Sequence, residues 1–507
     1  MGSSYMLIVL AFVCALQSAT GRPDYAINGE IKGSAVTADT ASLASLLLNL
    51  LDDYTFMLGA DYPLLERLTD ALSTIGTTLA DKGGIMADNV AVLAADDSGI
   101  VSAVFQDAID SIDEVLPLLS TGFAQQFLTL EHRNKKYITD MMKDVFGYLS
   151  DTLSTLNDLL GILQDAAEQA QIEAGGDEQP VSLALIRGTI SPRVIYSLMN
   201  AIAQLTAAIS PLLYAVDNSL ANVDEADTYI LTVKSDIETF LLQAHQEVVR
   251  FNGELRQLKT DTVGVIQNVG DPFEEQQPQI DELLPVLQAA TTFEDDLDGA
   301  LQLFERTVSA ASIAEKTVLL EDEVAAYISL AKTFDDDLVT LYGDQICPAV
   351  ISVAEVLVAN GPYATYCYNK YSQEVLDLAA HHYYHFTECY QLELNRIYSL
   401  HRLIVDLVDL VTFNYGELYD DFLVCLETEP CPGVDCNACI DTLGEVLDTL
   451  SRLANEKFSL IEQIIPTELD ASLQRLKSCT AFDQYKLIAD THDLVAAVYD
   501  CEETGYN

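Results

Sequence analysis

Basic residues are scarce in this chain of 507 residues, which has 25 Lys and Arg against 79 Asp and Glu. A formal net charge of −54 would be repelled by the phosphates of nucleic acid and by anionic lipid headgroups, so nucleic acid is excluded as a partner. Hydrophobic residues make up 50 % of the chain and charged residues 21 %, which excludes a chain that is disordered by composition.

Motifs of catalysis and modification are also missing. The chain has no G-x-S-x-G motif, no phosphate-binding glycine loop and no dinucleotide-binding fingerprint. Its seven histidines are scattered except for one cluster, so no nucleophilic site can be nominated. No Asn-x-Ser/Thr acceptor for conventional N-glycosylation occurs. The sequence therefore predicts no catalytic residues, no cofactor and no enzymatic activity.

The longest apolar run opens the chain. Residues 6–16 (MLIVLAFVCAL) form a run of 11 residues, too short to span a bilayer, and small residues follow at 18–21. This pattern predicts a signal peptide at residues 1–21, cleaved after Gly21; an uncleaved anchor is the alternative. No later stretch reaches ~18 unbroken apolar residues. We therefore expect a secreted, extracellular protein without a membrane span, folded in an oxidising environment.

Apolar residues recur at helical spacing in most of the chain, whereas strand-like alternation is scarce. The clearest stripe has alternating steps of four and three residues, typical of a helix in a bundle or a coiled coil. A bundle core is favoured over a dimerising coiled coil because flanking charges are sparse. The members of the stripe are Met142, Phe146, Leu149, Leu153, Leu156, Leu160 and Leu163.

Glycine and proline suggest how the mature chain is divided. Residues 22–40 look like an exposed leader, and residues 41–340 form a cysteine-free helical body. Gly83-Gly84 is expected to interrupt a helical hairpin, and sub-boundaries are expected near residues 175 and 270, where Gly and Pro occur together. The predicted fold is all-α, an elongated body of antiparallel helical hairpins followed by a cysteine-rich helical domain at 341–507.

Cysteine is absent from residues 41–340 and concentrated in residues 341–507. Cys14 lies in the predicted signal peptide, and nine cysteines lie in the last third of the chain, which in a secreted protein indicates a disulfide framework. The odd number leaves at least one without a partner in the monomer. The nine are Cys347, Cys367, Cys389, Cys425, Cys431, Cys436, Cys439, Cys479 and Cys501.

Eight of these cysteines are arranged almost as mirror images about residue 434, in a Pro- and Gly-containing turn. In two antiparallel helices, the numbers of facing residues add up to a constant. The outer pairs both total 868, and the inner pairs total 864 and 867. The predicted disulfides of this stapled hairpin are Cys367–Cys501, Cys389–Cys479, Cys425–Cys439 and Cys431–Cys436.

Three alternatives remain open for these cysteines. Pro466 could reverse the chain, which would make the matching totals accidental, and the inner cysteines could exchange partners. Cys347 is left over, either as a free thiol or in an intermolecular disulfide that links a dimer. The spacing of Cys436 and Cys439 could suggest zinc or redox chemistry, but a second such pair is missing and no histidine is near.

The cysteine pattern of residues 360–501 resembles the TsetseEP domain family of secreted insect proteins. The similarity lies in Tyr368 after Cys367, the aromatic-rich stretch up to Cys389, and the cysteine spacings that follow. The long Glu-Pro repeat of the family's namesake is missing, since only Glu429-Pro430 occurs. The resemblance implies secretion in an insect, often into the midgut lumen, and an immune or gut-barrier association. It implies no catalytic residues.

Two patterns are weak candidates for metal binding. His381 and His385 are one helical turn apart, with Glu388 or Asp377 as a possible third ligand. Residues 294–305 resemble a calcium-binding loop, but Glu stands where the loop begins with Asp. A polar helix face and an acidic turn are the favoured interpretations, so no metal is predicted. The ligands in the loop would be Glu294, Asp296, Asp298 and Glu305.

The sequence thus favours a secreted, acidic, non-enzymatic interaction or structural protein of insect gut or salivary secretion, with unknown protein partners. The alternative is a helical carrier that encloses a lipid or another hydrophobic ligand between long amphipathic helices.

Overall fold

The computed structural model describes residues 25–52, 57–176, 179–334, 336, 338–413, 415–428 and 433–505. Helices make up 89 % of the structure, and no strand occurs in these ranges, so the predicted all-α class is confirmed. The predicted signal peptide and residues 429–432 of the predicted turn, including Cys431, lie outside the described residues.

The chain forms two compact units. The first takes in Met1–Val233, Val350–Gln373 and Val495–Asn507, and the second takes in Lys234–Ala349 and Glu374–Leu494. Each unit therefore contains residues from both sides of the expected boundary near residue 340, and that boundary does not separate them. The reason is that four helices, α8 (Pro192–Gln267), α12 (Leu338–Val358), α13 (Ala364–Thr412) and α15 (Val434–Thr504), continue from one unit into the other.

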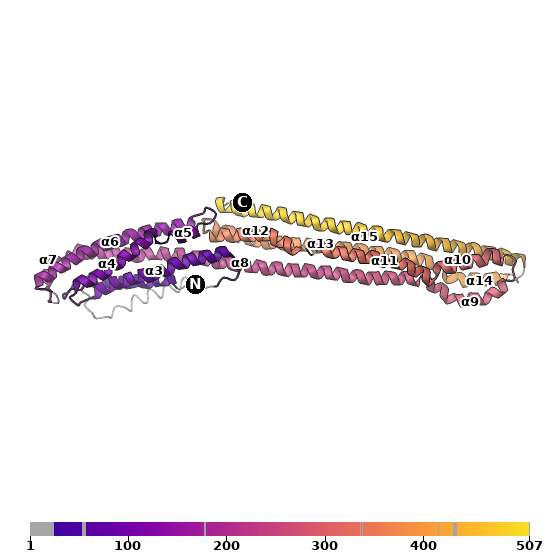
Figure 1. The fold of residues 1–507 in the computed structure, drawn as a ribbon, viewed down its shortest axis with the longest axis horizontal. Coiled ribbons are helices and arrows are strands. Elements are labelled where there is room, and N and C mark those ends of the chain that lie inside the picture. Colours follow the sequence, from indigo (N-terminus) through magenta and orange to yellow (C-terminus); the bar gives the residue numbers. More distant parts are fainter. Residues whose placement is uncertain are drawn as a thin grey trace. The chain divides into compact units, whose positions relative to one another are not determined.

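In the first unit, α3 packs against α2 and α4, and α4 packs against α6 (Figure 1). A π-helical turn, η2, continues α4. Besides the start of α8, the elements of this unit are α2 (Ser34–Asn49), η1 (Leu50–Asp52), α3 (Pro63–Ala95), α4 (Val101–Pro117), η2 (Leu118–Gly122), α5 (Ala124–Leu130), α6 (Tyr137–Ala174) and α7 (Leu183–Thr189). The end of α12, the start of α13 and the end of α15 complete it.

The second unit contains the end of α8, most of α13 and most of α15. At one end of it, α9 packs against α14 (Figure 1). Its other elements are η3 (Asn268–Gly270), α9 (Asp271–Leu287), η4 (Phe293–Asp298), α10 (Gly299–Val308), α11 (Ala310–Ala331), η5 (Lys332–Phe334), most of α12 (Leu338–Val358), η6 (Tyr415–Glu417) and α14 (Leu418–Thr428).

The apolar stripe predicted from the sequence is the buried face of α6. All seven of its members, from Met142 to Leu163, are at most 4 % exposed. Because α6 packs against α4 of the same chain, the stripe belongs to an intramolecular core. The expected loop after it is present, since α6 ends at Ala174 and Gly175 and Gly176 adopt positive φ angles of 110° and 119°.

Two expectations about the amino-terminal region were wrong. Gly83 and Gly84 do not interrupt a helix, because α3 runs through both. They let α2 approach closely: a Cβ at Gly83 would lie 3.1 Å from Leu48 Cδ1. The leader is not exposed where it is described, since Ile27 and Ile31 are buried and the Ala26 N–H donates to the Asp96 carbonyl.

The cysteine-rich limbs differ from a simple hairpin. The returning limb is one helix, α15, which continues through Pro466 instead of reversing there. The outgoing limb consists of α13 and α14, joined through the 3-10 turn Tyr415–Glu417. A 3-10 turn rises about 2.0 Å per residue against 1.5 Å in an α-helix, so the outgoing limb covers the same length with fewer residues. The three residues of this turn gain about 1.5 Å, the rise of one α-helical residue, so the turn accounts for about one of the four residues by which the Cys425–Cys439 total falls below 868.

Candidate functional site

Three disulfides join the cysteine-rich helices, and they are the pairs that the mirror spacing predicts. Cys367–Cys501 and Cys389–Cys479 link α13 to α15, each with 5.9 Å between Cα atoms, and Cys425–Cys439 links α14 to α15 at 5.5 Å. The first lies in the first unit and the other two lie in the second unit. Cys436 is also disulfide-bonded, while its predicted partner, Cys431, is outside the described residues.

Cys347 is the free cysteine among the described residues, and it is exposed on α12. Partial burial of its thiol, together with the nearby carboxylate of Asp344, raises the pKa of Cys347 above its ordinary value. Because the thiolate is the reactive form, this raised pKa lowers the reactivity of the thiol at neutral pH. The disulfides between the described cysteines are all intramolecular, and the predicted Cys347-linked dimer remains a proposal.

The histidine cluster on α13 separates into a buried ring and an exposed pair. His382 is fully buried, with Nδ1 2.8 Å from Asp483 Oδ1 and Nε2 3.4 Å from Asp490 Oδ2, both on α15. These polar contacts tie α13 to α15. Sequence reasoning did not single out His382, because its hydrogen-bond partner Asp483 is 101 residues away in the chain.

His381 and His385 lie one turn apart on α13, with their Nε2 atoms 3.1 Å apart. The Oε2 atom of Glu388 is 3.6 Å from Nδ1 of His385. Partial burial, His385, His382 and Lys486 lower the pKa of His381. No group of three or more His, Cys, Asp or Glu side chains able to hold a metal ion occurs among the described residues, so the third ligand considered from the sequence is not in place.

The candidate calcium loop is helical. Residues 293–298 form η4 and Gly299 begins α10 with φ −63°, whereas a calcium loop makes a sharp turn at this glycine. The Asp296 carbonyl lies against Gly444 of α15, where a side chain would clash with it. A hydrogen bond between the carboxyl groups of Asp296 and Asp441 raises the pKa of Asp296. Glu294, Asp296, Asp298 and Glu305 are therefore an acidic helical surface.

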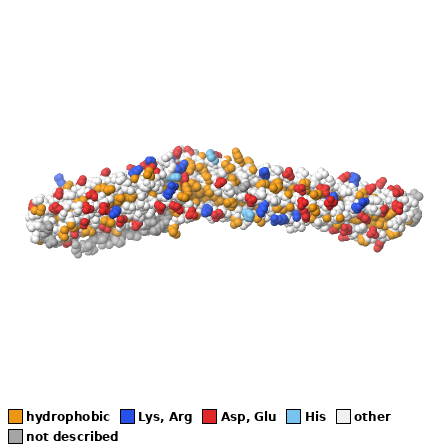
Figure 2. All heavy atoms as spheres, viewed as in Figure 1, with side chains coloured by type: hydrophobic (Ala, Val, Ile, Leu, Met, Phe, Trp, Pro, Cys, Tyr) orange, Lys and Arg blue, Asp and Glu red, His pale blue; other side chains and the backbone are white. Residues whose placement is uncertain are grey.

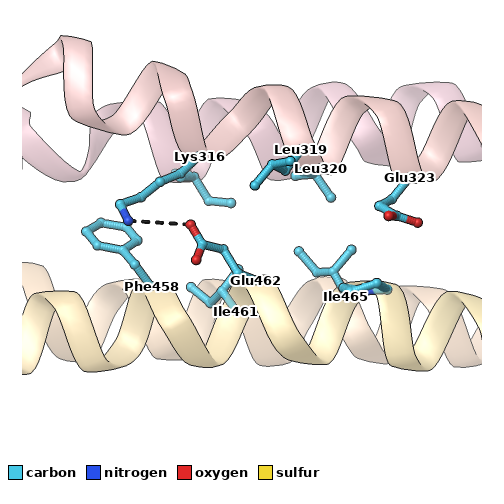
Figure 3. A pocket seen from close by; sticks show the side chains of 10 residues that line it. Lys316, Leu319, Leu320, Glu323, Phe458, Ile461, Glu462 and Ile465 are labelled. Atoms are coloured by element: carbon cyan, nitrogen blue, oxygen red, sulfur yellow. Dashed lines mark hydrogen bonds and ion pairs between the residues drawn. The ribbon is translucent and has the colours of Figure 1, made fainter.

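A small pocket lies between α11 and α15 in the second unit (Figure 3). Its volume is about 120 Å³, and its walls include Leu320, Ile461 and Ile465. At one end, Lys316 Nζ is 3.4 Å from Glu462 Oε1 and 5.4 Å from the centre of the Phe458 ring. The pocket is too small for a drug-sized ligand, since such sites have volumes of about 300–1,000 Å³. We interpret it as a packing defect beside an ion pair.

A larger cavity of about 600 Å³ lies in the first unit, beside the π-helical turn η2. One side is apolar, formed mainly by Leu119, Phe127 and Phe146. Lys143 Nζ lies 5.4 Å from the centre of the Phe127 ring, so a cation faces the apolar wall. The volume lies within the range of sites for small organic molecules, but the hollow is open to solvent, whereas such sites enclose most of their ligand. Sequence reasoning missed this cavity because its walls come from separate helices.

The most basic turn of the chain, between α5 and α6, lies against acidic and aromatic groups of the first unit. Glu355 accepts hydrogen bonds from the hydroxyls of Tyr62 at 3.0 Å and Tyr499 at 3.1 Å, and His132 Nε2 is 3.2 Å away. The Arg133 guanidinium stacks 3.3 Å from the centre of the Tyr499 ring. The described structure therefore places these basic groups in an internal network, where they are half-buried and partnered.

Buried tyrosines should make the stability of the chain depend on alkaline pH. Burial raises the pKa of Tyr25, Tyr327 and Tyr499 from 10.0 to about 12, and for Tyr499 the nearby Glu355 carboxylate contributes. Between pH 10 and 12 the folded chain keeps these protons and the unfolded chain loses them. The contribution of these tyrosines to the free energy of unfolding is therefore fully present below pH 10 and is lost as the pH rises toward 12.

We expect tyrosinate absorbance during an alkaline titration to lag behind that of the same chain in urea, and to rise together with the loss of helical circular dichroism. Coincident titration curves for the folded and the urea-unfolded chain would contradict this prediction.

Three helical stretches are long and apolar enough to cross a membrane, judged by length and composition alone: Ser34–Asp52, Pro192–Leu287 and Phe293–Val358. The share of each apolar window that is buried inside the structure is 39 %, 44 % and 56 %. A search for unbroken apolar runs missed them because mean hydropathy tolerates interspersed polar residues. We therefore treat the absence of a membrane span in the mature chain as a proposal.

Three comparisons with known proteins found no match to this chain. No family model matches it, and no curated protein or solved structure matches it at the threshold of significance.

Proposed function

We propose that this chain is a secreted, acidic, non-enzymatic protein that serves protein interaction or assembly in an extracellular fluid. The observation that carries the proposal is the set of intramolecular disulfides between α13, α14 and α15, because such crosslinks persist in oxidising compartments. The resemblance of the cysteine spacing to the TsetseEP domain family extends the proposal to insect gut or salivary secretion, with an immune or barrier association.

The surface charge supports a role at high concentration in such a fluid. Acidic side chains are spread over the visible face of the described residues, and basic ones are few (Figure 2). A strong net charge of one sign keeps proteins apart and in solution. Crosslinks between helices would also slow the local unfolding that proteases need.

The test is to express the full chain with its own amino terminus in cells that secrete proteins and to recover it from the medium. We expect a mature chain that begins at Arg22 and that resists a digestive protease until a reductant is added. Retention of the chain in the cell membrane would contradict secretion. A hydrolytic activity that is lost on substitution of a single described residue would contradict the non-enzymatic role.

A second candidate function is that of a carrier for a hydrophobic ligand, and the cavity beside η2 favours it. Gly147 lines this cavity and has no atom near the position of a Cβ. In the carrier, organic extraction of the purified chain should release a bound lipid, and Gly147→Phe should abolish the lipid while the chain stays folded. Gly161→Phe on the same helix is the control, since Gly161 also has open space but does not line the cavity.

A further inference from the structure

The exposed histidine pair of α13 has the geometry of two ligands of one metal ion. Imidazole nitrogens bind Zn²⁺ at about 2.0–2.1 Å, and two such nitrogens that are 3.1 Å apart subtend an angle of about 98° at the metal. This angle lies between the square-planar and tetrahedral values of about 90° and 109° that copper, nickel and zinc adopt. The two side chains already converge, so little reorganisation is needed.

Glu388 supplies a second feature of a metal site. Its carboxylate lies on the Nδ1 side of His385, at 3.6 Å, and leaves Nε2 directed toward His381. A carboxylate hydrogen-bonded behind a ligating histidine favours the proton on the rear nitrogen and leaves the lone pair on the nitrogen that meets the metal. At 3.6 Å, Glu388 lies just beyond hydrogen-bond distance and would form this bond after a shift of a few tenths of an ångström. Glu388 is therefore a positioning residue rather than a ligand.

Three other histidines have different surroundings. His382 is buried between Asp483 and Asp490, and His401 Nδ1 lies 2.7 Å from the Thr262 hydroxyl. His492 is 83 % exposed and has a carboxylate, Asp493, at 3.7 Å. None of these three rings pairs a nitrogen with a nitrogen of a second imidazole as His381 and His385 do.

We propose that His381 and His385 bind one divalent first-row transition-metal ion through their Nε2 atoms. Water would fill the remaining coordination positions, since the described residues offer no third protein ligand. Sites with two imidazoles and water favour Cu²⁺ and Ni²⁺ over Zn²⁺ and Mn²⁺, following the general order of divalent-metal affinities. The 79 acidic residues also bind these ions, but more weakly than two converging imidazoles, so the test has to distinguish nitrogen ligands from carboxylate ligands.

The test is a titration of the full chain, without an affinity tag, with Cu²⁺ in physiological salt and excess Ca²⁺ that occupies weak carboxylate sites. We expect one Cu²⁺ per chain and an electron paramagnetic resonance spectrum with two imidazole nitrogens. His381→Gln and His385→Gln should each weaken binding at least about tenfold and leave one nitrogen, while Glu388→Gln should weaken binding and keep both.

His492→Gln is the matched control and should leave binding unchanged, because that ring is exposed but alone. All four substitutions lie at exposed or half-exposed positions, and circular dichroism checks that the helices persist. A spectrum with a single imidazole in the unsubstituted chain, or affinity that survives His385→Gln, would overturn the proposal.

Discussion

Replacing Cys367 and Cys501 together by alanine is expected to lower the free energy of unfolding of the first unit by about 4 kcal/mol. The disulfide spans a sequence separation of 134 residues, but Cys389–Cys479 lies inside that segment, so removal of the outer bond opens only the loop made of residues 367–389 and 479–501. With the other crosslinks in place, the same relation gives about 3.5 kcal/mol for Cys389–Cys479 and about 3 kcal/mol for Cys425–Cys439. Alanine is chosen instead of serine because serine would place a hydroxyl at each of the two buried sites.

Urea unfolding followed by circular dichroism measures these losses. The order of the three double substitutions is the informative result, because every pair loses the same atoms and only the length of the crosslinked segment differs. Cys347→Ala is the control for a cysteine without a disulfide and should have little effect. Equal losses for all three pairs, or a largest loss for Cys425–Cys439, would show that crosslinking of the unfolded chain does not set their contributions.

Replacing Glu393 by alanine is expected to cost about 3 kcal/mol, because this carboxylate is 2 % exposed and holds three helices together. On α15, Ser472 Oγ donates to it at 2.8 Å and Arg475 Nε donates at 3.1 Å. The Ser472 hydroxyl also lies 2.9 Å from the hydroxyl of Tyr327 on α11. Removing the carboxylate leaves the Ser472 hydroxyl and Arg475 Nε without this acceptor, while the guanidinium of Arg475 keeps its bond to Glu468.

A double-mutant cycle of Glu393→Met and Arg475→Met measures the interaction energy between these two side chains, separately from their contacts with other residues. We expect Glu393→Met with Arg475→Met to recover part of the stability that either single change loses, because two apolar side chains leave no unpaired charge. Glu456→Ala removes the exposed Arg452–Glu456 pair of α15 and should cost less than about 0.5 kcal/mol. If Glu393→Ala cost no more than this control, the buried network would not stabilise the unit.

The cysteine pairing could be predicted because it depends on a simple property of helices. Residues rise by a constant step, so facing positions in two antiparallel helices keep a constant total, and both outer pairs meet this condition. The stripe on α6 could be predicted for the same reason, since helical periodicity directs its members to one face. Part of the departure of the inner pair required knowledge of the 3-10 turn at Tyr415–Glu417.

Other features could not be read from spacing. Gly83-Gly84 looks like a break in the sequence, yet in α3 it is the place where another helix approaches. The calcium-like residues 294–305 carry the right ligand types, but packing against Gly444 keeps them helical. In both cases a neighbour that is distant in sequence decided between two local structures that the residues themselves permit.

The sequence by itself determined that this protein is all-helical, which faces of its helices are buried and which cysteines meet. Each of these depends on the fixed geometry of one helix or one pair of helices. Only the tertiary structure decided where the compact units divide, that His382 and Glu393 are buried among partners on α15, and that Nε2 of His381 and of His385 converge. Burial of a polar group depends on which side chains from other helices surround it, and periodicity along one helix carries no information about them.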